Sequence, residues 1–136
     1  MLDHMTLRVS DYVVSKAFYT AALAPLDYSL MAEFEHDGAK IAGFGWVRPD
    51  GRRKVDWWIV QTPPAAGLVV SGPTHLALLA KDRATVAAFH QAAITAGGKD
   101  NGAPGVRPHY HADYYGAFVL DPDGNNIEAV CHLPSE

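Results

Sequence analysis

Apolar and polar residues alternate in several short stretches of the chain and change to a helical spacing between them. Residues 2–9 alternate as the residues of a half-buried β-strand do. In residues 14–22 the apolar side chains lie three and four positions apart instead, which is typical of a helix with one buried face. Ser10 or Asp11 can cap the start of this helix, and Pro25 ends it.

The rest of the chain continues with strand-like runs and then repeats the order strand, helix, strands. After the first helix, strand patterns separated by Asp-Gly turns cover residues 28–35, 40–47 and 54–61. Residues 63–72 are rich in proline, alanine and glycine, which is typical of a linker. Beyond it we expect a strand at 74–80, a helix after Asp82, a weak strand near Lys99, a Gly/Pro-rich loop at 102–108, and strands at 114–120 and 126–131.

The residues themselves also recur in the same order. His4 and His75 lie 71 positions apart, and each begins a strand that leads into a capped helix. Pro-Asp-Gly occurs once in each half, at residues 49–51 and 122–124. Such a repeat indicates two copies of one structural unit. We therefore predict an α+β fold of two tandem βαβββ modules related by a pseudo-twofold axis.

The expected boundaries follow from this repeat. Residues 1–136 form a single domain, with module one at about 1–62, the linker at 63–72 and module two at about 73–136. Each helix covers one face of its small sheet. The remaining faces also need cover, and we expect the two sheets to form a common open cup.

Strand alternation has a consequence for three polar residues. It places His4 and His75 on the cup side of their strands, and Glu128 on the cup side of an otherwise apolar strand. A carboxylate there must be paired, solvated or bound to a cation. Two imidazoles and a carboxylate can hold a divalent metal and leave positions open for substrate. Alternatively, each histidine is an ordinary core residue with a hydrogen-bond partner, and the residues alone leave both interpretations open.

Composition narrows the class of protein. The 136 residues carry 11 Lys and Arg against 15 Asp and Glu, a net charge of −4, which argues against a partner bound through nucleic-acid phosphates. A single cysteine, Cys131, and the lack of a signal peptide or a membrane-length apolar run favour a cytoplasmic protein without membrane contact. A homodimer is expected, because two small modules bury a thin core and leave apolar strand faces to cover.

Three motifs carry a resemblance to a known family: residues 4–11 with Phe18-Tyr19, residues 72–77, and residues 114–128, which end in Asp-Pro-Asp-Gly-Asn-x-Ile-Glu. With these motifs the chain resembles the vicinal oxygen chelate superfamily, which contains glyoxalase I, bleomycin-resistance proteins and extradiol dioxygenases. The resemblance covers nearly the whole chain. It implies paired βαβββ modules that form an open cup around a small-molecule substrate.

The resemblance also implies a set of metal ligands, His4, His75 and Glu128, for one divalent ion such as Fe, Mn, Ni or Zn. Glyoxalase I enzymes usually add a Glu in the last strand of the first module. Here the repeat places Trp57 or Val55 at that position, and neither binds metal. Asp56 lies between them and could serve as a ligand only if the strand is bulged.

Further residues around the cup have expected roles. The expected substrate contacts are Arg8, Trp46, Trp57, Tyr114 and His109, and the expected catalytic groups are Glu128, His111 and Tyr115. The cation of Arg8 can bind a substrate carboxylate or phosphate, or it can pair with an acidic residue at the rim. The aromatic residues can line a pocket or belong to the core or a dimer interface. Residues 109–111 can fold over the site as acid, base or extra ligand, or remain a solvated loop.

Three classes of function remain from these observations. The first is a small metalloenzyme, a lyase or isomerase resembling lactoylglutathione lyase or else a ring-cleaving dioxygenase, which acts on a substrate with vicinal oxygens. The second is a metal-free protein that binds a drug or another small molecule, as bleomycin-resistance proteins do. The third is a structural or regulatory module with a vestigial site, because the fold alone does not confer function.

Overall fold

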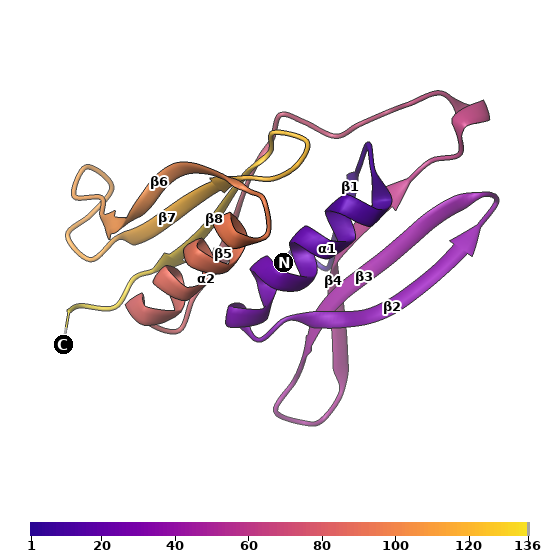
Figure 1. Ribbon diagram of the computed structural model, residues 1–136. Helices are drawn as coiled ribbons and strands as arrows, with labels where there is room; N and C mark the ends of the chain where they lie inside the picture. Colours follow the sequence, from indigo (N-terminus) through magenta and orange to yellow (C-terminus); the bar gives the residue numbers. More distant parts are fainter. Residues whose placement is uncertain (136) are drawn as a thin grey trace.

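The computed structural model describes residues 1–135 as two similar modules that lie side by side (Figure 1). The first module consists of β1 (Met5–Arg8), α1 (Tyr12–Leu23), the 3-10 turn η1 (Ala24–Leu26), β2 (Ser29–His36), β3 (Ala39–Val47) and β4 (Arg53–Gln61). A connecting segment with the 3-10 turn η2 (Pro64–Ala66) follows. The second module consists of β5 (His75–Leu79), α2 (Arg83–Thr95), β6 (Lys99–Val106), β7 (Tyr115–Leu120) and β8 (Asn126–Cys131).

The two sheets have the same topology. Their strand orders are β1-β4-β3-β2 and β5-β8-β7-β6. In each sheet the first strand pairs in parallel with the last, and the other pairs are antiparallel. This arrangement confirms the predicted α+β fold of two βαβββ modules, with sheets that remain open.

The helices begin and pack in equivalent ways in the two modules. The carboxylate of Asp11 accepts a hydrogen bond from the Val14 N–H (3.0 Å), and that of Asp82 accepts one from the Thr85 N–H (2.7 Å). Each aspartate thus satisfies a backbone donor that the first turn of a helix leaves free. One turn further on, Phe18 and its repeat counterpart Phe89 are fully buried between helix and sheet.

One strand is longer than the sequence pattern suggests. The prediction of a Gly/Pro-rich loop at 102–108 is wrong for most of these residues, because β6 continues to Val106. Its pairing with β7 shifts register between Asp100 and Gly102 and again between Gly102 and Gly105. As an edge strand, β6 can accommodate a proline and two irregularities that a central strand would not tolerate.

The modules are joined through their helices and through one turn. Helices α1 and α2 pack against each other (Figure 1). From α1, the Tyr19 hydroxyl donates to the buried carboxylate of Asp121 in the β7–β8 turn (2.5 Å). In the same turn Asp123 accepts from the backbone N–H of Ser10 (3.1 Å) and from its hydroxyl. These contacts hold the two sheets side by side, with the helices covering one face of each.

The opposite faces of the sheets carry the alternate side chains of every strand. In β1, Leu7 is buried under the helix, whereas Thr6 and Arg8 are exposed on the open face. Large apolar side chains are also exposed there, for example Phe34 (49%) and Leu79 (74%). No helix within residues 1–135 is long and apolar enough to cross a membrane.

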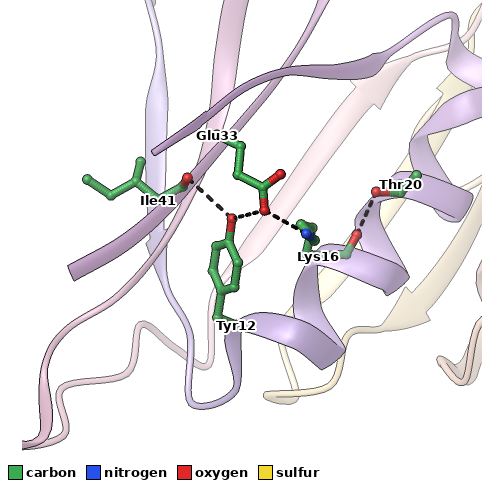
Figure 2. A network of polar contacts seen from close by, with 5 residues as sticks. All are labelled: Tyr12, Lys16, Thr20, Glu33 and Ile41. Atoms are coloured by element: carbon green, nitrogen blue, oxygen red, sulfur yellow. Dashed lines mark hydrogen bonds and ion pairs between the residues drawn. The ribbon is translucent and has the colours of Figure 1, made fainter. Parts of the chain in front are cut away.

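A polar network connects α1 to β2 and β3 of its sheet (Figure 2). The Tyr12 hydroxyl donates to Glu33 in β2 (2.8 Å) and lies 3.3 Å from the Ile41 carbonyl oxygen in β3. The Lys16 ammonium pairs with the same Glu33 oxygen at 2.6 Å. Burial, together with the Glu33 carboxylate, raises the pKa of Tyr12 to about 12, so the hydroxyl keeps its proton and acts as a donor.

Replacing Tyr12 with Phe should therefore lower the free energy of unfolding by about 1 kcal/mol, the usual net value of one hydrogen bond. Urea unfolding monitored by circular dichroism measures the change. The exposed Tyr110 provides the matched control, because its conversion to Phe should leave the midpoint unchanged. Equal midpoints for both variants would show that the network does not stabilise the helix.

Candidate functional site

A buried carboxylate occupies the open face of the second sheet. Glu128 in β8 is only 1% exposed, although it lies on the face that no helix covers. Its Oε2 lies 2.8 Å from Nε2 of His75 in β5, and its Oε1 accepts the Tyr114 hydroxyl at 2.5 Å. Of the three alternatives expected for Glu128, namely paired, solvated or bound to a cation, the structure shows pairing, and the two partners divide the carboxylate oxygens between them.

The surroundings of Glu128 are shaped to hold this arrangement. Burial and the neighbouring carboxylate raise the pKa of Tyr114 well above its usual value, so its hydroxyl remains a proton donor at neutral pH. A side chain at Gly116 would place its Cβ 3.0 Å from Glu128 Oε1 and 3.2 Å from the Tyr114 ring. Glycine at this position of β7 therefore leaves the space in which the carboxylate and the phenol meet.

His4 lies in a different environment. Its Nδ1 is 2.7 Å from an Asp3 carboxylate oxygen, and its side chain is 57% exposed. Hydrogen bonds from His4 and from Lys54 lower the pKa of Asp3 to about 2, so this carboxylate is charged at neutral pH. An Nδ1–H bond to a carboxylate leaves Nε2 free, which is how most metal-binding histidines are oriented.

The donors present fit a divalent metal only in part. At metal–ligand distances of about 2.0–2.2 Å, ligand atoms at neighbouring positions lie roughly 3.0–3.4 Å apart. The 2.8 Å between His75 Nε2 and Glu128 Oε2 needs to widen by only a few tenths of an ångström. Within residues 1–135 of one chain, however, no group of three His, Cys, Asp or Glu residues is placed to hold a metal.

The first sheet has a tryptophan where the second has Glu128. Thr6 in β1 pairs with Trp58, whereas Ala77, its counterpart 71 positions later, pairs with Glu128. The sequence-based placement of Trp57 or Val55 opposite Glu128 is therefore wrong, because the repeat offset is one residue shorter in the last strand. The conclusion drawn from it still holds, since an indole is no metal ligand.

Asp56 is the extra residue of a bulge in β4. Phe44 pairs with Trp57, and the next residue of β3 pairs with Val55, so Asp56 has no partner opposite it. Its carboxylate accepts from Trp46 Nε1 (3.3 Å) and from the Tyr28 hydroxyl. These residues line a cleft of about 530 Å³ between the modules, and neither His75 nor Glu128 lines that cleft.

The aromatic residues expected around the cup are distributed over several places. Tyr114 lies at Glu128, as described. Trp46 and Trp57 line the cleft between the modules, and Trp57 is otherwise buried in the core against Tyr19. Tyr115 packs against the core beneath the Arg83 guanidinium, on the helix side of β7. Its position argues against the catalytic role expected from the sequence, because successive strand residues point to opposite faces.

The remaining expected residues lie at the rim of the open faces. His111 Nε2 and His132 Nδ1 are 2.9 Å apart, and the His111 ring also packs edge-on against Tyr114. The His109 ring packs on Tyr110. Arg8 is exposed and, among residues 1–135, has no carboxylate within ion-pair distance, so the rim salt bridge considered from the sequence is not formed.

Two groups that matter to the site were missed from the sequence. One is Arg107, which follows β6 and lies over the Phe118 ring on the open face. The other is Asp121, which the sequence shows only as the residue before the repeated Pro-Asp-Gly segment and as part of the family motif. Arg107 could have been noticed as the cation that ends a glycine-rich segment. Nothing in the pattern near Tyr19 or Asp121 indicates that these residues meet.

Comparison with known proteins agrees with this geometry. A family model described as the Glyoxalase/Bleomycin resistance protein/Dioxygenase superfamily matches residues 1–129. The chain belongs to this superfamily. None of the curated proteins matches it significantly. The superfamily includes glyoxalase I lyases and dioxygenases as well as resistance proteins, so membership alone leaves the activity open.

Solved structures of superfamily members share the fold. A glyoxalase/bleomycin resistance protein from Albidiferax ferrireducens T118 is 28% identical, with a TM-score of 0.67 over 96% of this chain and 98% of that chain. Glyoxalase I from Zea mays is 20% identical, with a TM-score of 0.68 over 98% of this chain, which spans only 45% of the maize protein. A family enzyme from Burkholderia phytofirmans PsJN is 21% identical, with a TM-score of 0.64 over 97% of this chain and 98% of that chain.

Proposed function

We propose that this protein is a metal-dependent enzyme that acts on a small molecule with two adjacent oxygens, at a divalent metal held by His75 and Glu128. The observation that carries the proposal is the buried Glu128 carboxylate, with one oxygen 2.8 Å from the His75 imidazole on an open sheet face. A divalent metal at this pair would supply Lewis acidity to the oxygens of a substrate.

The third ligand in this proposal is His4 of a second copy of the chain. Helix packing and the contact between Tyr19 and Asp121 hold the two modules of one chain side by side, and within residues 1–135 no third donor joins His75 and Glu128. A homodimer can instead lay the first sheet of one copy over the second sheet of the other. His4 suits this role because Asp3 holds its Nδ1 and leaves Nε2 free.

The surface around His4 also favours such a dimer. A hollow on the open face of the first sheet is lined by Asp3, His4 and Thr6 and by the apolar side chains of Phe34, Ile41, Val55, Trp58 and Val60. Exposed apolar strand faces of this kind are usually covered in an assembly. Over the second sheet, the same side chains would exclude water from the Glu128 site and strengthen its electrostatic interactions.

Within the site, the residues of this chain would have distinct roles. Tyr114 donates to Glu128 Oε1 and so directs Oε2 towards His75 and the substrate. Because its pKa is raised, Tyr114 keeps its proton and serves as an orienting donor rather than as a base. His111 and His132 border the Tyr114 ring, and His111 is the nearest candidate for proton transfer at the rim.

Three protein ligands leave positions open for substrate, which is typical of a catalytic rather than a structural metal. Lyase or isomerase chemistry and ring-cleaving oxygenation both need such open positions. The apolar hollow of the first sheet would equally suit the alternative, a metal-free protein that binds a drug or another small molecule.

Metal analysis separates these two functions. Protein purified without chelator should contain close to one divalent metal per chain, measured by mass spectrometry of the metal. The His75→Gln variant should lose it, because one of its ligands is gone. His36→Gln removes an exposed histidine on β2 and should retain the metal. Equal, negligible metal in all three proteins would leave the small-molecule-binding protein as the better account.

A further inference from the structure

A second feature of the open face lies beside the Glu128 site. Arg107 directly follows β6, and its guanidinium carbon lies 5.4 Å from the centre of the Phe118 ring. Phe118 pairs with Glu128 across β7 and β8, and its ring centre is 6.1 Å from that of His75. The same face of the second sheet therefore carries an imidazole, a carboxylate, an aromatic ring and a cation in neighbouring strands.

Glycines make the space in which this guanidinium lies. A Cβ at Gly105 would lie 2.9 Å from Arg107 Nη1, and a Cβ at Gly102 would lie 3.3 Å from Nη2 and 2.8 Å from the Phe118 ring. Gly102 also has a φ of +152°, which other residues rarely adopt. A side chain at either position would crowd the guanidinium in its present place.

The guanidinium is held in place without being neutralised. Nη2 donates to the Ala103 carbonyl oxygen at 2.7 Å, and Nη1 lies 3.4 Å from the Val106 carbonyl oxygen. No carboxylate of residues 1–135 lies within ion-pair distance of it. Because arginine has five N–H donors, several remain free in a fixed orientation, and its charge is only partly shielded by Phe118.

From this geometry we propose that Arg107 forms an anion-binding subsite, which selects substrates with a carboxylate or phosphate at the end remote from the reacting oxygens. That the substrate reacts at two adjacent oxygens rests on the proposed function, whereas the anion-binding subsite rests on the geometry of Arg107 alone. Arg107 follows β6, two strands from Glu128 in β8, and its guanidinium lies over Phe118 in the strand between them. The substrate would therefore extend across β7, with its anionic group paired to the guanidinium fork.

The test uses metal-free protein, so that its outcome is independent of the metal site. The metal is removed with EDTA, the EDTA is dialysed away, and the side-chain Nε–H signals of the arginines are followed by ¹⁵N NMR in 0.15 M NaCl. The probes are propionate, methyl phosphate and the neutral propionamide. The Arg107 signal should shift saturably with an anionic probe and stay unchanged with propionamide. A response to propionate alone, to methyl phosphate alone or to both identifies the anionic group and supports the subsite.

Three variants complete the experiment. Arg107→Gln should weaken anion binding at least about tenfold, as measured on the backbone signals of Phe118 and Gly102. Arg107→Lys keeps the charge without the fork and should lie in between. Arg53→Gln removes an exposed cation at the start of β4 and should bind as the wild type does. Equal shifts at Arg53 and Arg107, an equal response to propionamide, or unchanged binding by Arg107→Gln would overturn the proposal.

Discussion

Replacing Asp121 with Asn is expected to lower the free energy of unfolding by about 2–3 kcal/mol, although the two side chains have nearly the same shape. The Asp121 side chain is buried and accepts four hydrogen bonds. They come from the Tyr19 hydroxyl (2.5 Å), the Asn125 side-chain amide (2.9 Å) and the backbone N–H groups of Asp123 (2.9 Å) and Asn125 (2.8 Å). The asparagine side chain has only one accepting oxygen. Its NH2 group would therefore face donors that bond to a carboxylate oxygen in the wild-type protein.

Unfolding in urea measures this loss of stability, and two further variants serve as comparisons. Tyr19→Phe removes only the hydrogen bond from the Tyr19 hydroxyl to Asp121 and should cost about 1–2 kcal/mol. Burial and the Asp121 charge raise the pKa of Tyr19 well above its usual value, so the wild-type hydroxyl is always a donor. Glu35→Gln makes the same chemical change on an exposed residue of β2 and should have almost no effect. An Asp121→Asn variant as stable as Glu35→Gln would show that this turn does not join the modules.

Much of the fold and half of the site could be predicted because they depend on local periodicity. The repeat gave two modules with matching caps at Asp11 and Asp82. Alternation within a regular strand placed His75 and Glu128 on one face, and the structure brings their side chains together. Such predictions work where the period of a strand is unbroken, since each residue then has a defined side.

The parts that could not be predicted depend on irregular pairing or on long-range packing. The bulge at Asp56 reverses the alternation within β4, and nothing in the residues around it requires a bulge. Tyr19 and Asp121 meet across 102 positions of sequence, which no periodic pattern reports. Arg107 lies on the sheet only because β6 extends through a glycine-rich segment that is more often a loop.

The second large effect concerns the metal. In the proposed dimer each site contains His75 and Glu128 of one chain and His4 of the other, so His4→Ala and Glu128→Gln should each abolish binding at both sites. Mutating a residue that hydrogen-bonds to a metal ligand weakens metal affinity by up to about 100-fold. Removing a ligand itself should therefore weaken the affinity by more than that. His4 is exposed, and glutamine is nearly isosteric with Glu128, so both variants should keep the wild-type fold. Calorimetric metal titration of each purified variant measures the loss, and wild-type affinity in either would contradict it.

Mixing the two variants tests the central claim most directly. Chains carrying His4→Ala and Glu128→Gln, each with a different affinity tag, are refolded together, and the mixed dimer is isolated through both tags. One of its two sites then combines the intact His4 of one chain with the intact His75 and Glu128 of the other. We predict one tightly bound metal per mixed dimer, two per wild-type dimer and none in either parent variant. A mixed dimer without metal, beside a wild-type protein that binds it, would place the whole site within one chain and contradict this account.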